Sequence, residues 1–142
     1  MIRSVLIDNS AWARLGDPRL PYARSAEIAE AVEGGRVVAC LPFLLEAGYS
    51  ARNAADHSEI FAQLLALPWA RLDEQVERRA VDAQRHLAQL GHHRLPPVDV
   101  VVAALADRHG LGILHYDRDY DLIAQKTDLR FDSVWLSEPG QL

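Results

Sequence analysis

The chain has 142 residues, of which 20 are acidic and 15 are basic, and its formal net charge is −5. Hydrophobic residues make up 49% of the chain and charged residues 25%, a composition typical of folded proteins and unlike that of disordered ones. The length corresponds to one domain, which we expect to span residues 1–142.

The single cysteine, Cys40, excludes an internal disulfide and a cysteine-based zinc site. The first eight residues contain no long apolar segment followed by small residues, so we expect no signal peptide. The longest apolar stretches, residues 37–45 and 100–106, are too short to span a bilayer. We therefore expect a cytoplasmic protein with no membrane partner.

Short apolar segments alternate with longer helical ones along the chain. In chain order, the pattern predicts a strand over 2–7, helices over 10–15 and 22–33, a strand over 37–41, and helices over 43–51 and 56–66. It then predicts a strand over 69–72, helices over 74–90 and 98–108, a strand over 112–115, a helix over 120–126 and a strand over 133–136.

Individual residues support the predicted helix ends and faces. Asp73 is a good N-cap for the longest helix, Pro42 suits a first helical position, and Gly110 ends the helix that precedes it. We expect an apolar face on the helix over 22–33 at Ala26, Ala29 and Val32. On the longest helix we expect one at Val76, Ala80, Ala83, Leu87 and Leu90.

This alternation predicts an α/β fold with three layers, in which helices cover both faces of a parallel sheet of about five strands. Strand order 3-2-1-4-5 is the common order that places the first and fourth strands side by side. In such folds, functional groups gather at the carboxyl ends of the strands, where the strand order reverses.

Four carboxylates fall near this predicted edge. Asp8 follows the first strand and Asp117 the fourth, so neighbouring strands would bring both side chains into one crevice. Glu46 and Asp99 lie within strongly apolar helical segments, where an uncompensated carboxylate is costly. Independent helix caps have no reason to fall at these strand ends and on the flanking helices together.

A divalent cation would compensate these carboxylates. No basic residue lies within one helical turn of Asp99, and only Arg52 lies near Glu46 in the sequence. Oxygen ligands without a His or Cys pair suit Mg²⁺ or Mn²⁺ rather than zinc. Setting the four acids aside, 20 less 4 leaves 16 acidic residues against 15 basic ones, so phosphate binding is not excluded.

Each of these acids also has a simpler interpretation. Asp8, Asp99 and Asp117 could each be the N-cap of the helix that follows. Glu46 could face solvent from its helix. Ser10, two residues after Asp8, could likewise cap a helix, or it could orient a ligand or a phosphate.

Asp119 is an alternative to Asp117 as the fourth acid, although Asp119 and Asp121 could instead form a turn and a helix start. Arg118 and His115 could contact a nucleic-acid backbone, but residues of these types also occur on surface loops without function.

The loop cluster at residues 92–94, His-His-Arg, could also contact a nucleic-acid backbone, or it could be part of a surface loop without function. Cys40 is expected to be an inert, buried side chain. The three tryptophans are expected in the core rather than as platforms for stacked bases: Trp12, Trp69 and Trp135.

Four segments carry a resemblance to a known family, namely VLIDNS at 5–10, LPFLLE at 41–46, PVDVVVAALA at 97–106 and LHYDRDY at 114–120. Together they resemble a PIN domain, and more narrowly a VapC-type toxin of a bacterial toxin–antitoxin pair. None of the segments is specific alone, but the ordered set spans almost the whole chain and is considerably more specific.

The resemblance implies a metal-dependent endoribonuclease that arrests growth by cutting RNA and is held silent by a cognate antitoxin. By this resemblance, four acidic residues bind Mg²⁺, or Mn²⁺ in its place: Asp8, Glu46, Asp99 and Asp117. Ser10 matches the hydroxyl beside the quartet. Asn9 departs from the family, which usually has Thr, Ser or another small residue there.

The second acid after the fourth strand, Asp119, makes the choice of Asp117 ambiguous, and we take Asp119 and Arg118 as supporting or phosphate-positioning residues. The expected reaction is hydrolysis of RNA phosphodiester bonds to 5′-phosphate and 3′-hydroxyl ends. A symmetric homodimer is also expected.

Two other classes of protein compete with this interpretation. One is a catalytically inactive scaffold of the same shape that binds only proteins, although such a scaffold has no need of every acid. The other is a phosphoacceptor receiver or a haloacid-dehalogenase-like phosphatase. A receiver needs a lysine after the last strand, but Lys126 precedes it, and such a phosphatase needs Asp-x-Asp where this chain has Asp8-Asn9-Ser10.

Overall fold

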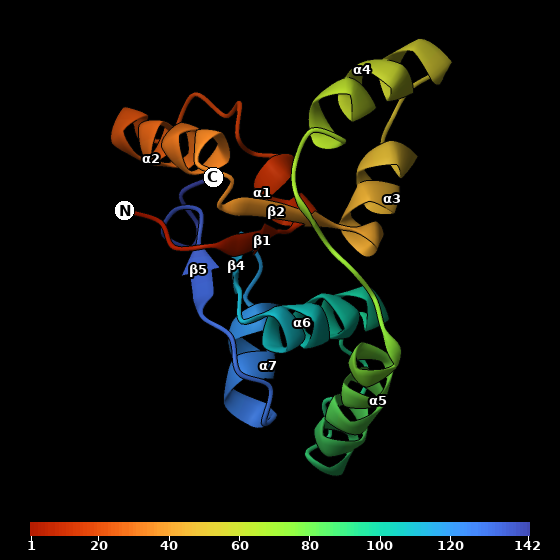
Figure 1. Cartoon of the computed structure of the whole chain (residues 1–142). Coiled ribbons are helices and arrows are strands. Elements are labelled where there is room, and N and C mark those ends of the chain that lie inside the picture. Colours follow the sequence, from red (N-terminus) through yellow and green to blue (C-terminus); the bar gives the residue numbers. More distant parts are fainter.

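Five short apolar segments pair side by side into one parallel sheet in the computed structural model, which describes residues 1–142 (Figure 1). The strands are β1 (Val5–Ile7), β2 (Val37–Cys40), β3 (Trp69–Ala70), β4 (Gly112–His115) and β5 (Ser133–Trp135). Their order, β3-β2-β1-β4-β5, confirms the prediction. Every residue of β1, β2 and β4 is buried, as expected for central strands covered on both faces.

The central strand, β1, sets the position of the functional edge. Leu6 pairs with Val38 of β2 on one side and with Ile113 of β4 on the other. Immediately after β1, the backbone amide of Asp8 donates to the carbonyl of Leu114 at 2.9 Å. The residues that follow β1 and β4 are therefore neighbours.

Seven helices cover the sheet. They are α1 (Asn9–Trp12), α2 (Tyr22–Glu33), α3 (Leu41–Tyr49), α4 (Ala54–Leu64), α5 (Glu74–Gln89), α6 (Pro97–His109) and α7 (Asp119–Lys126). Figure 1 shows α5, α6 and α7 on one side of the sheet and α2 and α4 on the other. α1 and α3 begin within two residues of the ends of β1 and β2, and α7 begins after a short loop beyond β4, so their N-termini lie at the carboxyl edge of the sheet.

All twelve predicted elements are present, and their ends differ from the predicted ones by at most three residues. The predicted apolar face of α2, however, is wrong. The residues predicted on that face are exposed: Ala26, Ala29 and Val32. Ile28 and Ala31 are buried instead, because tertiary packing rather than the local pattern sets which face of α2 meets the core. On the same helix, Arg24 donates to the carbonyls of Trp135 and Leu136 at 2.8 and 3.1 Å.

The predicted apolar face of α5 is largely confirmed. Val76, Ala83 and Leu87 are buried, and Ala80 packs partly buried against the core. Leu90 is an exception because it lies beyond the last helical residue, where it is exposed. None of the helices combines the length and hydrophobicity needed to cross a bilayer.

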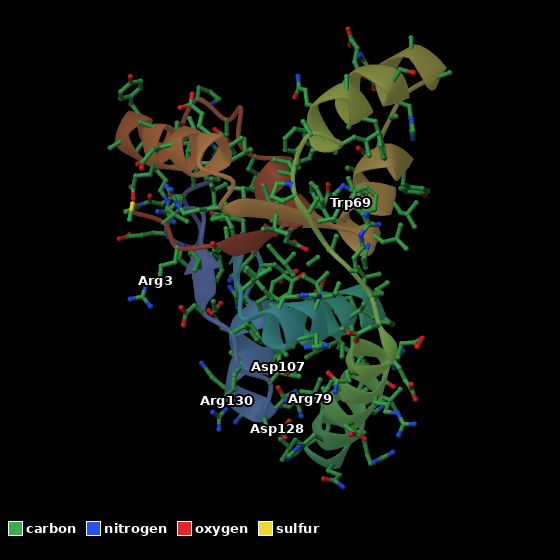
Figure 2. All side chains as sticks on the ribbon, in the orientation of Figure 1. Arg3, Trp69, Arg79, Asp107, Asp128 and Arg130 are labelled. Carbon is green, nitrogen blue, oxygen red and sulfur yellow. The ribbon has the colours of Figure 1, made fainter.

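An ion-pair cluster joins α5 and α6 to the segment after α7. The guanidinium of Arg79 lies 3.2 Å from the carboxylate of Asp107 and 3.3 Å from that of Asp128, and Figure 2 shows the three side chains together. The other oxygen of Asp107 accepts the backbone amide of Arg130 at 2.9 Å. This cluster fastens α6, which carries Asp99, to both of its neighbours.

We predict that Asp73→Ala lowers the free energy of unfolding by about 1–2 kcal/mol. The Asp73 carboxylate caps α5 by accepting the amide of Val76 at 2.9 Å and also lies 3.0 Å from Arg108. Urea unfolding measures the change. Asp82→Ala is the control because its contact with Arg85 is exposed, and it should cost less than about 0.5 kcal/mol. Equal losses would contradict the capping role.

Candidate metal centre

Asp8 follows β1 and is held by Ser10 of α1. Its Oδ2 accepts the backbone amide of Ser10 at 3.0 Å and the hydroxyl of Ser10 at 2.6 Å. The Ser10 hydroxyl oxygen in turn accepts the amide of Tyr116, beyond β4, at 2.9 Å. The helix-cap interpretation of Asp8 is therefore confirmed, and the same bonds fix its carboxylate at the edge between β1 and β4.

Asp99 lies in the first turn of α6 with an exposed fraction of 8%. Its interpretation as an N-cap is wrong, since Pro96 occupies that position and no side chain caps the helix. Its Oδ2 is buried and has no hydrogen-bond partner. An unpartnered carboxylate oxygen in the interior is costly, so this atom indicates a missing positive partner.

Sequence reasoning missed Tyr120, which joins these two acids. Its side chain is completely buried in α7, and its hydroxyl oxygen lies 2.6 Å from Oδ1 of Asp8 and 3.2 Å from Oδ1 of Asp99. One hydroxyl proton thus serves two acceptors. Burial and the charges of Asp8 and Asp99 raise the pKa of Tyr120 well above its usual value. A tyrosine rather than a phenylalanine on a buried helix face was the available signal.

Both candidates for the fourth acid reach the same cluster. One carboxylate oxygen from each of Asp99, Asp117 and Asp119 lies within 4.8 Å of the other two. Oδ1 of Asp117 accepts the amide of Asp119 at 3.0 Å, but the N-cap interpretation of Asp117 is wrong, because Arg118 occupies the N-cap position of α7. Burial and the charge of Asp117 raise the pKa of Asp119, while the exposed Arg118 opposes that rise.

Glu46 approaches the cluster from α3 on the side of Asp8. Its side chain is half-buried and makes no hydrogen bond. Its pKa is raised, first by burial and then by the charge of Asp8. The structure thus brings Asp99, Asp117 and Asp119 together, joins Asp8 to Asp99 through a hydroxyl, and leaves Glu46 beside Asp8.

The donor set fits a hard divalent cation. The cluster offers only oxygen atoms, and one of them, Oδ2 of Asp99, is buried without a partner. Burial, followed by the charges of Asp8 and Asp117, raises the pKa of Asp99 to about 7. A cation would remove this electrostatic cost.

Two other sequence interpretations are resolved by burial. His115 is completely buried, so the suggestion that it contacts a nucleic-acid backbone is wrong. Cys40 is also completely buried, and burial raises the pKa of its thiol to about 11, which confirms an inert side chain. Of the tryptophans, Trp12 packs its ring edge-on against Phe43 with centroids 6.3 Å apart.

Comparison with known proteins places this geometry in context. The PIN domain family matches residues 5–126. Ribonuclease VapC2 of Mycobacterium tuberculosis (strain CDC 1551 / Oshkosh) is 38% identical over 139 residues, which cover 95% of each protein. Ribonuclease VapC51 of Mycobacterium tuberculosis (strain ATCC 25618 / H37Rv) is 35% identical over 127 residues, 89% of this chain and 90% of that protein.

Among solved structures, the chain is similar to VapBC-5 from Mycobacterium tuberculosis, a member of the VapBC family of toxin-antitoxin systems. The TM-score is 0.62 at 20% identity, over 92% of this chain and 98% of that one. At this identity, the likeness concerns the fold alone.

We predict that Asp99→Asn stabilises the protein in chelator at pH 8 by roughly 1–3 kcal/mol, and by much less at pH 4.5. The folded-state pKa of about 7 exceeds the ordinary value of 3.8, so the folded protein binds the extra proton between these values. The wild-type free energy of unfolding therefore falls as pH rises through that window. The Asp99→Asn variant does not lose this free energy, because asparagine does not titrate.

Urea unfolding of both proteins at the two pH values measures this difference. Asp82→Asn, which changes an exposed carboxylate, should show no pH-dependent gap. A gap of equal size at pH 4.5 and pH 8 for Asp99→Asn would disprove the electrostatic strain at Asp99.

Proposed function

This chain belongs to the PIN domain family, and we propose that it is a metal-dependent endoribonuclease, the toxin of a toxin–antitoxin pair. The observation that carries the proposal is the unpartnered, buried Oδ2 of Asp99 within a group of convergent carboxylates. The relatives named ribonucleases, which match this chain over most of its length, support RNA as the substrate. We further propose that residues 1–142 act as one PIN-like domain.

The proposed ligands of the cation are Asp8, Glu46, Asp99 and Asp117. A bound Mg²⁺ or Mn²⁺ would neutralise charge on the phosphate and activate a water molecule for in-line attack on phosphorus. The P–O3′ bond breaks in this reaction, which leaves 5′-phosphate and 3′-hydroxyl ends.

The chain's own residues prepare this edge of the sheet. Ser10 holds Oδ2 of Asp8 with two hydrogen bonds, and Tyr120 holds Oδ1 with a third. Glu46 accepts no hydrogen bond from the protein, so its carboxylate is free to hold the cation or take a proton. These contacts orient the ligands before RNA arrives.

Two neighbouring residues support the phosphate and the cation. Arg118 is exposed beside the carboxylates and can donate to a phosphate oxygen. Asp119, in the first turn of α7, adds negative charge that strengthens cation binding. The net charge of −5 is compatible with an RNA substrate because the acids that the cation would neutralise are concentrated here.

The partners we propose are a cognate antitoxin and a second copy of the chain, and the proposed location is the cytoplasm. VapBC-5, a structural relative from a toxin-antitoxin system, supports the antitoxin. An inactive protein-binding scaffold is disfavoured, because such a scaffold does not need clustered, buried carboxylates, which cost stability.

We predict that Asp99→Asn and Glu46→Gln each lower the rate of RNA cleavage by about 100-fold or more. Each variant keeps the shape of the side chain and removes its charge. The assay follows a labelled mixed-sequence RNA with Mn²⁺, with Mg²⁺ and with chelator. Asp82→Asn should cleave like the wild type, and chelator should stop cleavage. Equal cutting by wild type, Asp99→Asn and chelated protein would rule out the proposed function.

We also predict that Asp117→Asn weakens Mn²⁺ binding more than Asp119→Asn does. Asparagine at 117 can still accept the amide of residue 119, so α7 should begin normally and the loss should be one of charge and coordination. Isothermal titration calorimetry compares the two affinities. A larger loss in Asp119→Asn would assign the fourth ligand to Asp119.

A further inference from the structure

A chain of hydrogen bonds runs from the backbone of Asp117 into the interior. His115, the last residue of β4, is completely buried, and both of its ring nitrogens have partners. Nδ1 lies 3.1 Å from the backbone nitrogen of Asp117, and Nε2 lies 2.6 Å from the hydroxyl oxygen of Ser133 on β5. The imidazole therefore lies between the loop that carries Asp117, just after β4, and the neighbouring strand β5.

The direction of each hydrogen bond follows from donor chemistry. A backbone amide can only donate, so Nδ1 of His115 must be the acceptor. The ring proton of neutral His115 is then on Nε2 and is donated to Ser133. Ser133 donates its own proton to Oδ1 of Asp121 at 2.6 Å, and Oδ2 of Asp121 accepts the indole N–H of Trp135 at 2.9 Å.

This assignment leaves no alternative tautomer. Each carboxylate oxygen of Asp121 accepts one donor, so Asp121 orients Ser133, and Ser133 orients His115. Trp135 also packs against the imidazole, with ring centroids 4.9 Å apart, and limits its rotation. Moving the ring proton to Nδ1 would leave the amide of Asp117 facing another donor.

We propose that His115 is a positioning residue for the candidate metal centre: as the Nε2–H tautomer, it holds the amide of Asp117 and so fixes the carboxylate of Asp117. Oδ1 of Asp117 is held separately by the amide of Asp119. These two bonds hold the backbone and one oxygen of Asp117, whose carboxylate lies with those of Asp99 and Asp119, one oxygen of each within 4.8 Å of the others. The inference rests on the proposed function in taking Asp117 as a cation ligand.

Two substitutions separate this role from simple packing. In His115→Asn, the amide oxygen can take the place of Nδ1 and still accept from Asp117, while the bond to Ser133 is lost. In His115→Gln, the amide nitrogen can take the place of Nε2 and still donate to Ser133, while the amide of Asp117 loses its acceptor. Packing alone favours glutamine, because asparagine leaves the larger cavity.

The first measurement uses the metal-free protein. A long-range ¹H–¹⁵N spectrum of the imidazole should show a neutral ring with its proton on Nε2. The amide of Asp117 should be protected from hydrogen exchange in the wild type and in His115→Asn, and should lose protection in His115→Gln. A ring protonated on Nδ1, or equal protection in both variants, would overturn the inference whether or not a cation binds.

The second measurement is the Mn²⁺ affinity from calorimetry. His115→Gln should bind Mn²⁺ about 10-fold to 100-fold more weakly than the wild type, and His115→Asn should retain most of the affinity. His86→Asn, at an exposed position in α5, is the control. Affinity that is lower in His115→Asn than in His115→Gln would indicate packing and overturn the inference. A wild type that binds no Mn²⁺ would instead refute the proposed function, and the metal-free measurement would still decide the role of His115.

Discussion

One phenolic proton lies between two buried carboxylates, and the candidate site depends on how this arrangement is maintained. The hydroxyl of Tyr120 is closer to Asp8, at 2.6 Å, than to Asp99, at 3.2 Å. Asp8 also receives two bonds from Ser10, whereas the second oxygen of Asp99 has none. Negative charge is thus well compensated at Asp8 and poorly compensated at Asp99, which is where a cation contributes most.

The fold maintains this arrangement by ending several elements at one edge. β1 lies between β2 and β4, so the residues that follow β1 and β4 are neighbours. α6 runs back along the sheet and begins at the same edge, with Asp99 in its first turn. Asp99 and Asp119 lie in the first turns of α6 and α7, where the helix dipole favours negative charge. The ion pairs of Arg79 hold α6 in position against α5.

Support for the site extends beyond the carboxylates. Ser10 bonds to both Asp8 and the amide of Tyr116, so it couples the end of β1 to the loop after β4. His115 holds the amide of the next residue but one, Asp117, from inside the sheet. The loop that carries Asp117 is therefore fixed from two sides. Such fixed geometry lowers the reorganisation needed to bind a cation and a phosphate.

The strand order was predicted from the order common to such folds, because no local pattern specifies which strands pair. The amino-acid sequence by itself determined the elements and placed the acids after the first and fourth strands and on the flanking helices. These depend on local patterns: apolar strands, the Asp73 cap and the rule for parallel crossovers. Tertiary structure alone decided that Tyr120 joins Asp8 across 112 positions, and that α2 buries Ile28 and Ala31 rather than the predicted face. A sequence names each donor and acceptor, but a hydrogen bond requires two groups at a set distance, and packing determines which distant groups meet.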